Sequence, residues 1–188
     1  NCKYSDITVF SFHPVKIITT GVGGAAMTNS KNLSIKMKLL SSHGITRDKD
    51  DMYDKSCAPW YYEQIDLGFN YRLTDIHAAL GSSQIDRLDK YVLCRDKIAN
   101  LYNKNFENNA KVAPLIQKKN RKSSHHLYVL KIQDKSLDRN LLYKLLRDNG
   151  IGVNVHYIPV YRQPYFKNKV VENYLRESEI YYSSAISL

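Results

Sequence analysis

The chain has 188 residues, of which 43% are hydrophobic and 24% are charged, a composition typical of a soluble globular protein. This length is enough for one full domain or for parts of two domains. No run of about 18 apolar residues is present, so we expect no membrane-spanning helix. The three cysteines form no paired framework and no secretory leader opens the chain, which predicts a cytoplasmic protein. The chain begins without a methionine, and we interpret it as an internal piece of a longer protein.

The net charge of +10 predicts an anionic partner. Nucleic acid and a phosphorylated metabolite are both candidates, and the 15 tyrosines keep the first one open because aromatic rings stack on bases. The lysines, however, are spread along the chain apart from one basic run at residues 118–122, which is typical of a solvated loop. We therefore favour a phosphorylated small molecule and expect no nucleic-acid partner.

The first part of the chain predicts extended segments followed by a helix. Apolar residues dominate 6–12, which indicates a mostly buried strand, and 17–28 predicts two short extended pieces folded about a glycine-rich turn. A helix follows, with Asn29 or Ser30 as its cap. We expect it to end near Gly44, because glycine accepts the left-handed conformation at a helix end.

The middle of the chain combines a long loop with a long helix. Residues 45–65 show no period, and loops of this length in compact domains are usually functional or disordered. The adjacent aromatics at 60–62 favour docking over disorder. Thr74 then caps a single predicted helix that continues towards Tyr102. Gly81 inside this helix indicates close packing against another backbone, for which a subunit interface would suffice.

Beyond residue 106 the pattern predicts a small, βαβ-like α/β domain that the long helix joins to the first part. An apolar stripe of leucines marks its first helix, and Gly150 closes that helix. The expected elements are strands at 111–115, 126–132 and 151–157, a helix at 136–149 and a last helix from about Lys169.

The stretch "SFHPVKIITTGVGGAAMT" at 11–28 places Lys16 between a short apolar strand and the glycine-rich turn. A lysine held among apolar groups has its charged form disfavoured, which makes the amine a better nucleophile. That suits a Schiff base with an aldehyde cofactor, of which pyridoxal phosphate is the commonest. Ser11 stands where its hydroxyl could donate to a phosphate. Spacing alone nevertheless favours a lysine whose amine reaches the surface, because most lysines are exposed.

Two other glycine-containing stretches bear on phosphate binding. The turn at 21–24 matches neither the dinucleotide fingerprint nor a P-loop, and indicates a tight turn with close backbone approach. "GFNYRLTD" at 68–75 places Asn70 and Arg72 just before a helix start, a position that favours phosphate. Asn70 could equally bond its own backbone, and the spacing does not decide.

The histidines do not predict a metal site. His125, His126 and His156 have no accompanying ligand spacing of the kind that zinc requires, so we expect no metal. His126 alternates with apolar residues on a strand and is expected to pack. His156 closes a strand at a loop, where packing and ligand contact are equally open.

Five stretches resemble successive blocks of the DegT/StrS family of sugar aminotransferases: "SFHPVKIITTGVGGAAMTN", "LLSSHGI", "GFNYRLTDIHAALGSSQIDRLD", "HLYVL" and "GVNVHYIPVYRQPYF". Within the family, "ITRDKD" and "WYYEQIDLGFNYRLTDIHAALG" are most similar to the branch acting on UDP-4-keto-6-deoxy-N-acetyl-altrosamine in pseudaminic acid synthesis. The resemblance implies an α/β chain with the PLP-dependent transferase fold of the aspartate aminotransferase type, covering about half of the family's length. It assigns 1–105, with the long helix, to the C-terminal part of the large cofactor-binding domain. It assigns 106–188 to the small C-terminal α/β domain, incomplete at its end.

The resemblance also implies roles for individual residues. Lys16 matches the Schiff-base lysine that binds pyridoxal 5'-phosphate, and Ser11 matches a ligand of the cofactor phosphate. Asn70 matches the amide that reaches the cofactor phosphate of the neighbouring subunit, which implies a homodimer. The segment that meets the nucleotide sugar corresponds to His156, Tyr157, Ile158 and Pro159.

The implied activity is transfer of an amino group, expected from L-glutamate, to the C4 ketone of a UDP-linked 4-keto-6-deoxy amino sugar. Lys16 would move the proton between the donor's Cα and the cofactor. Related dehydratases carry histidine where this chain has Lys16, which favours transamination. The net charge fits a UDP pyrophosphate, because steering of a small anion needs only a diffuse positive field.

Two positions depart from the family pattern. Val22 stands where the family usually has the glutamate of "GEGG", and Ser41 stands where it tends to have arginine or lysine. Loss of the carboxylate implies weakened or abolished activity. The alternative is therefore a catalytically impaired or non-catalytic member of the family that acts as a binding protein.

Overall fold

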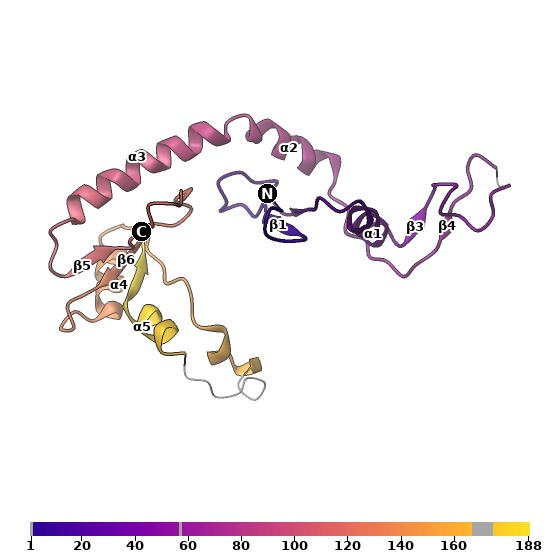
Figure 1. Cartoon of the computed structure of the whole chain (residues 1–188). Helices are drawn as coiled ribbons and strands as arrows, with labels where there is room; N and C mark the ends of the chain where they lie inside the picture. The colour runs from indigo at the N-terminus through magenta and orange to yellow at the C-terminus, as the bar shows by residue number, and fades with distance from the viewer. Residues whose placement is uncertain (1, 57, 167–174) are drawn as a thin grey trace. The chain divides into compact units, whose positions relative to one another are not determined.

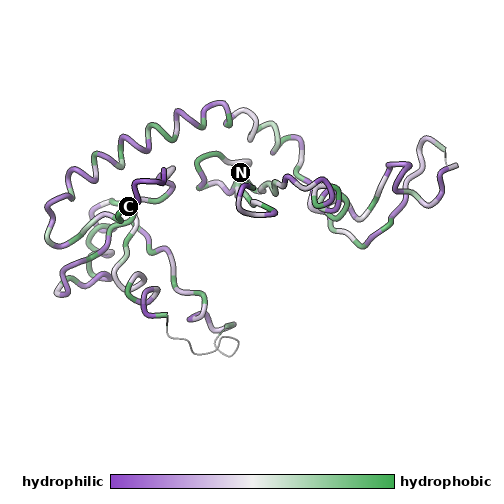
Figure 2. The backbone as a smooth tube through the Cα atoms, in the orientation of Figure 1, coloured by the Kyte–Doolittle hydropathy of each residue, from purple (hydrophilic) through white to green (hydrophobic). Residues whose placement is uncertain are grey.

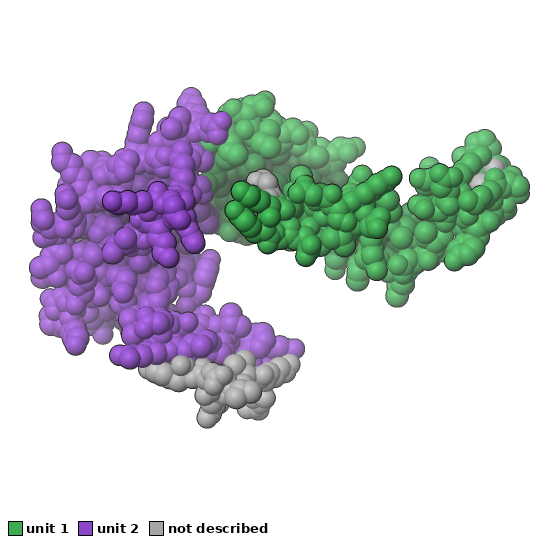
Figure 3. All heavy atoms as spheres, in the orientation of Figure 1, with its two compact units in different colours: residues 1–88 green, residues 89–188 purple. Residues whose placement is uncertain are grey.

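The computed structural model of the chain describes residues 2–56, 58–166 and 175–188. Two compact units divide the chain, Asn1–Leu88 and Asp89–Leu188, drawn green and purple in Figure 3. The boundaries predicted at 1–105 and 106–188 refer to the large and small domains of the full-length family fold. That division stays a prediction.

The described residues of the first unit form two small antiparallel sheets and two helices (Figure 1). Strands β1 (Thr8–Ser11) and β2 (Gly24–Met27) pair with Thr8 opposite Met27 and Ser11 opposite Gly24. Helix α1 follows at Lys31–Ser41. The two-residue strands β3 (Ile45–Thr46) and β4 (Glu63–Gln64) pair next, and α2 (Asp75–Ile85) closes the unit.

Side-chain caps start both helices: Thr74 caps α2 as predicted, and Ser30 is the one of the two predicted alternatives, Asn29 and Ser30, that caps α1. The Ser30 hydroxyl accepts the Leu33 N–H at 3.4 Å, and the Thr74 hydroxyl accepts the His77 N–H at 3.3 Å. Gly44, just beyond α1, has a φ of 69° and so takes the left-handed conformation expected of it.

The prediction that strand 6–12 is mostly buried is wrong. The strand forms over Thr8–Ser11, but Val9 is 75% exposed. Its only strand partner among the described residues is β2, and a two-stranded sheet buries little without a layer on its face. Of the aromatics at 60–62 that were expected to dock, Trp60 does not do so within this unit, since it is 76% exposed, whereas Tyr61 is partly buried.

The single helix predicted from Thr74 towards Tyr102 is instead two helices, α2 and α3 (Leu88–Phe106). The break falls at residues 86–87, where the Arg87 N–H donates to the Gln84 carbonyl at 3.0 Å. Such an i to i−3 bond tightens the last turn and ends the α-helical ladder. No proline or glycine marks this break in the sequence.

The second unit is built on the antiparallel sheet β5-β6-β7. Its strands are β5 (Val112–Pro114), β6 (Val129–Ile132) and β7 (Ala185–Ser187). In addition to α3, the unit contains the helices α4 (Arg139–Asp148) and α5 (Arg176–Ser184). Two short 3₁₀ turns lie at Val160–Arg162 and Pro164–Phe166. The core of buried apolar side chains comprises Val112, Leu130, Val153 and Ile186.

Two strand expectations for this unit are wrong. The strand expected over 151–157 is a single bridge between Asn154 and Ser187, and β7 takes the sheet position beside β6. The sheet is antiparallel, so the βαβ-like arrangement does not form. β7 follows α5 directly and has only three residues. Such a segment is too short for the alternation of apolar and polar residues to predict a strand. The expected start of the last helix near Lys169 lies outside the described residues.

Hydrophilic and hydrophobic residues alternate along α3 (Figure 2). In the described part of the chain, no helix combines the length and apolar composition needed to cross a membrane.

Candidate cofactor and substrate site

Lys16 lies on the loop that joins β1 to β2, residues 12–23, called the lysine loop below. The Phe12 N–H donates to the Gly23 carbonyl at 2.9 Å and closes the neck of the loop. The Phe12 carbonyl accepts the Thr20 N–H at 3.1 Å and the Thr19 hydroxyl at 2.8 Å. These bonds fold the loop back on itself, with Lys16 inside the closed segment.

The two residues assigned to the cofactor in and next to this loop differ in exposure. Lys16 is partly buried, and its backbone N–H donates to the His13 carbonyl at 2.9 Å to form a turn. Ser11 ends β1 and is exposed, and its hydroxyl accepts the His13 N–H at 3.4 Å. The structure therefore places Ser11 just before the lysine loop and Lys16 within it, on either side of His13.

The glycine-rich turn has the close backbone approach predicted for it at Gly24, where a Cβ would overlap the Phe10 carbonyl oxygen. Gly23 has a φ of 125°, and a Cβ there would lie 2.8 Å from Leu73 Cδ1. Val22, the residue in the place of the family's glutamate, is 61% exposed. A side chain at this position meets solvent rather than a packed interior.

Helix α2 fastens the lysine loop. A Cβ on Gly81 would lie 2.8 Å from the Cγ2 of Thr20. Gly81 is thus closely packed, but against this buried side chain and not against another backbone as predicted. Gln84, one turn further on, bonds through its carboxamide to the backbone of Thr19. Sequence reasoning missed Gln84, because nothing near it in the chain distinguishes it from a surface glutamine.

Asn70 lies on a segment that packs against the end of α1. The Tyr71 N–H donates to the Ser41 carbonyl at 2.9 Å, and Asn70 forms an isolated bridge with Ser42. Asn70 is exposed, and its Oδ1 accepts the Nε–H of Arg72 at 3.2 Å. The amide and the cation predicted together before α2 are thus hydrogen-bonded to each other.

The segment 156–159 belongs to the second unit and is anchored at its first residue. His156 Nδ1 lies 2.9 Å from the hydroxyl of Ser187, a buried residue of β7. Tyr157 is 71% exposed and Ile158 49%. The hydrogen bond to β7 therefore fixes His156, while the side chains of Tyr157 and Ile158 are exposed and accessible to a ligand.

A carboxylate anchors the chain just beyond this segment. Glu179 Oε1 accepts the Tyr161 hydroxyl and the Arg162 Nε–H, both at 2.8 Å. Hydrogen bonds from Arg162, and then from Tyr161, hold the pKa of Glu179 below its ordinary value. Burial and the bond to Glu179 raise the pKa of Tyr161. Sequence reasoning missed this cluster too.

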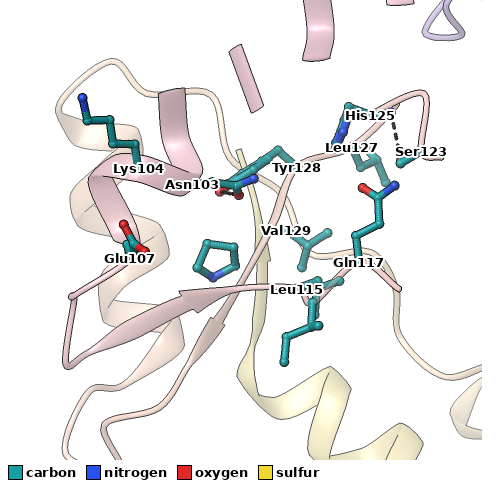
Figure 4. A pocket seen from close by; sticks show the side chains of 12 residues that line it. Asn103, Lys104, Glu107, Leu115, Gln117, Ser123, His125, Leu127, Tyr128 and Val129 are labelled. Carbon is teal, nitrogen blue, oxygen red and sulfur yellow. Dashed lines mark hydrogen bonds between the residues drawn. The ribbon is translucent and has the colours of Figure 1, made fainter. Parts of the chain in front are cut away.

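The described residues include a hollow of about 690 Å³ between the end of α3, the residues after β5, and 123–129 (Figure 4). Asn103 and Tyr128 meet there, with the Tyr128 hydroxyl donating to Asn103 Oδ1 at 2.7 Å. None of the residues predicted for cofactor or sugar lines it. The described residues also hold no group of three or more histidine, cysteine or acidic side chains suited to a metal ion.

Residues 1–188 match the DegT/DnrJ/EryC1/StrS aminotransferase family. The chain belongs to this family. The predicted family is thereby confirmed, and the match runs through the lysine loop, the Asn70 segment and the 156–159 segment.

Individual relatives agree with the family match. The chain is 38% identical over 187 residues to a UDP-4-amino-4,6-dideoxy-N-acetyl-beta-L-altrosamine transaminase of Campylobacter jejuni, covering 99% of this chain and 47% of that protein. It is 35% identical over 182 residues to the Helicobacter pylori transaminase of the same name, covering 96% and 46%. The chain thus spans about half the length of the curated relatives it matches.

Solved structures show the same fold. Helicobacter pylori PseC, an aminotransferase involved in the biosynthesis of pseudoaminic acid, superposes with a TM-score of 0.87 at 34% identity, over 98% of this chain and 48% of that one. The putative sugar aminotransferase Spr1654 of Streptococcus pneumoniae, in its PMP form, gives 0.86 at 28% identity, over 100% and 49%. The predicted α/β transferase fold is confirmed for the part of the fold that this chain spans.

Proposed function

We propose that the protein carrying this chain is a pyridoxal-phosphate-dependent aminotransferase that acts on a nucleotide sugar. The match of all 188 residues to an aminotransferase family is the observation that carries the proposal. The substrate is a UDP-linked 4-keto-6-deoxy amino sugar, and support comes from the names of the Campylobacter and Helicobacter relatives. L-glutamate is the amino donor, and the working form is a cytoplasmic homodimer.

The residues present fit the cofactor chemically. A primary amine, a hydroxyl and a carboxamide suit an aldehyde and a phosphate, and Lys16, Ser11 and Asn70 supply these groups in the first unit. Lys16 is partly buried on a hydrogen-bonded loop, whereas Ser11 and Asn70 are exposed and accessible to an anion. When bound, pyridoxal phosphate supplies an electron sink that stabilises a carbanion.

In this proposal Lys16 has two tasks. Its Nζ holds the aldehyde carbon of the cofactor in the resting protein, and it accepts and returns a proton during transfer. Ser11 Oγ and Asn70 Nδ2 donate to the phosphate, Asn70 towards the neighbouring subunit. Loop bonds at Phe12 limit the freedom of Lys16, which favours a fixed position for the reacting amine.

The segment His156, Tyr157, Ile158 and Pro159 binds the nucleotide sugar in this proposal. Exposed rings such as Tyr157 offer apolar area beside hydrogen-bonding groups, a combination suited to a sugar nucleotide. The net charge of +10 draws in the UDP pyrophosphate.

Lys16→Ala in the full natural protein tests the proposal. We expect the visible absorbance of bound pyridoxal phosphate and the glutamate-dependent amination of the keto sugar both to disappear, while Lys36→Ala on the exposed face of α1 keeps both. A wild-type protein that neither binds the cofactor nor aminates the sugar would overturn the proposal. The comparisons give no support to the non-catalytic alternative raised by Val22.

A further inference from the structure

The lysine loop is fastened to α2 by the side chain of Gln84. Its Oε1 accepts the N–H of Thr19 at 3.2 Å, and its Nε2 donates to the carbonyl of Thr19 at 3.0 Å. The side chain is partly buried, and it joins residues 65 positions apart in the chain. Gln84 thus satisfies both backbone groups of Thr19, as a neighbouring strand would.

Thr19 makes a further closing contact of the lysine loop, inside the neck that Phe12 and Gly23 form. Its hydroxyl donates to the Phe12 carbonyl at 2.8 Å and accepts the Gly21 N–H at 2.9 Å. Lys16 lies three residues before Thr19, inside the segment that this closure defines. A shift of Thr19 therefore moves the backbone that carries Lys16.

Only a carboxamide satisfies this arrangement. The carboxamide of glutamine holds an NH₂ donor group and a carbonyl acceptor in one plane, and these match the Thr19 carbonyl and N–H. A glutamate in its place would accept the N–H but set its second oxygen against the Thr19 carbonyl oxygen. A methionine would keep the length of the side chain and offer no donor.

We propose that Gln84 is a positioning residue for Lys16. It acts through its two hydrogen bonds to Thr19. This inference rests on the proposed function, in which Lys16 Nζ binds the aldehyde carbon of pyridoxal phosphate. Small displacements of a reacting group lower reactivity steeply, so the two bonds of Gln84 control how readily Lys16 reacts.

The test measures labelling of Lys16 in the full natural protein after removal of bound cofactor. Wild-type and Gln84→Glu proteins are titrated with pyridoxal phosphate and reduced with borohydride, and the label on Lys16 is quantified by peptide mass spectrometry. We expect the concentration for half-maximal labelling to rise about tenfold in Gln84→Glu, because one bond is lost and a repulsion is added. The visible circular dichroism of the bound cofactor, which reports a fixed orientation, should weaken in parallel. Gln133→Glu, the same change at an exposed site in the second unit, should match the wild type in both measurements.

The outcomes of this experiment distinguish a failure of the proposed function from a failure of the proposed role of Gln84. No label on Lys16 in the wild type overturns the proposed function and the role of Gln84 with it. Label on wild-type Lys16 with unchanged half-maximal labelling in Gln84→Glu overturns the role of Gln84 alone. A merely structural role would lower the melting temperature of the cofactor-free protein and leave the labelling of its folded fraction unchanged. If Gln84→Glu does not fold, Gln84→Met replaces it, and unchanged labelling there overturns the inference.

Discussion

The two units of this chain are stabilised in different ways. Among the described residues, the first unit buries one large apolar side chain deeply, that of Met52, whereas the second has a connected core around Ile186, which is 1% exposed. The first unit relies on single hydrogen bonds and close glycine contacts, such as those of Gln84 and Gly81. Burial of a core is spread over many contacts, whereas these local bonds act one at a time.

This contrast has a consequence for the candidate site. The proposed cofactor residues Ser11, Lys16 and Asn70 all belong to the unit with little core. Their geometry therefore depends on a few identifiable contacts, and single substitutions should disturb it without abolishing the fold of the second unit. The four predictions below test this difference, from the largest expected effect on free energy or binding to the smallest.

Ile186→Ala should destabilise the second unit by about 3 kcal/mol, because it leaves a cavity in a fully buried position. Val9→Ala, at a 75% exposed position of β1, should change stability by less than about 0.5 kcal/mol. Hydrogen exchange with mass spectrometry on the full chain reports the two units separately. Equal effects of the two substitutions would contradict the contrast in burial.

Gly81→Ala should displace the lysine loop rather than simply strengthen α2. The new methyl group would meet Thr20 Cγ2 at 2.8 Å, and Thr20 is only 2% exposed, so the loop has little room to yield. We expect labelling of Lys16 by pyridoxal phosphate to weaken on the order of tenfold.

The double variant Gly81→Ala with Thr20→Ser is the matched control. Serine removes Cγ2 but keeps the hydroxyl that donates to the Val22 carbonyl. It should restore most of the labelling. Failure of this rescue would argue that the Gly81 contact does not set the position of the loop.

Glu179→Gln should weaken the second unit at neutral pH and much less in acid. The pKa of Glu179 lies below its ordinary value because Arg162 and Tyr161 bind the ionised form, so the carboxylate stabilises the fold above that ordinary value. The contribution is lost as the pH falls from about 4.5 through the lowered pKa.

Denaturant unfolding followed between pH 7 and pH 3 checks this prediction. The stability difference between wild type and Glu179→Gln should shrink towards the acid end. Glu177→Gln removes the same charge from the same turn of α5 and serves as control. A difference for Glu179→Gln that does not vary with pH would count against the ion pair.

Val22→Glu should have the smallest effect on stability, within about 0.5 kcal/mol, because the side chain is 61% exposed. Turnover by the full protein should rise, since the variant restores the carboxylate usual in the "GEGG" turn. Urea unfolding and a transaminase assay of the same preparations measure the two effects. Unchanged or lower turnover, with cofactor bound, would mean that this family member works without the carboxylate.

Sequence reasoning succeeded where the physical cause is local. Ser30 and Thr74 were predictable as helix caps because a cap needs only a side chain and the next three residues. Gly44 was predictable as a helix end for the same kind of reason. The resemblance identified the family because its motifs are short, ordered stretches of sequence.

Several of the failures involve partners distant in the chain, whereas the break between α2 and α3 comes from the local bond between Arg87 and Gln84. The exposure of β1 depends on what covers a sheet, which the strand's own sequence does not state. Gln84 matters because of a residue 65 positions away. The roles assigned to Ser11, Lys16, Asn70 and 156–159 stay predictions, since they concern bound molecules.

The contact between Gly44 and Gly68 limits how this protein can be redesigned. A side chain at Gly44 would overlap the backbone of Asp66, and one at Gly68 would overlap the backbone at Gly44. Because backbone meets backbone, no second substitution can relieve the first. A laboratory evolution campaign aimed at the Asn70 segment therefore has no accessible route through either glycine, and libraries should leave both positions fixed and diversify beyond Tyr71.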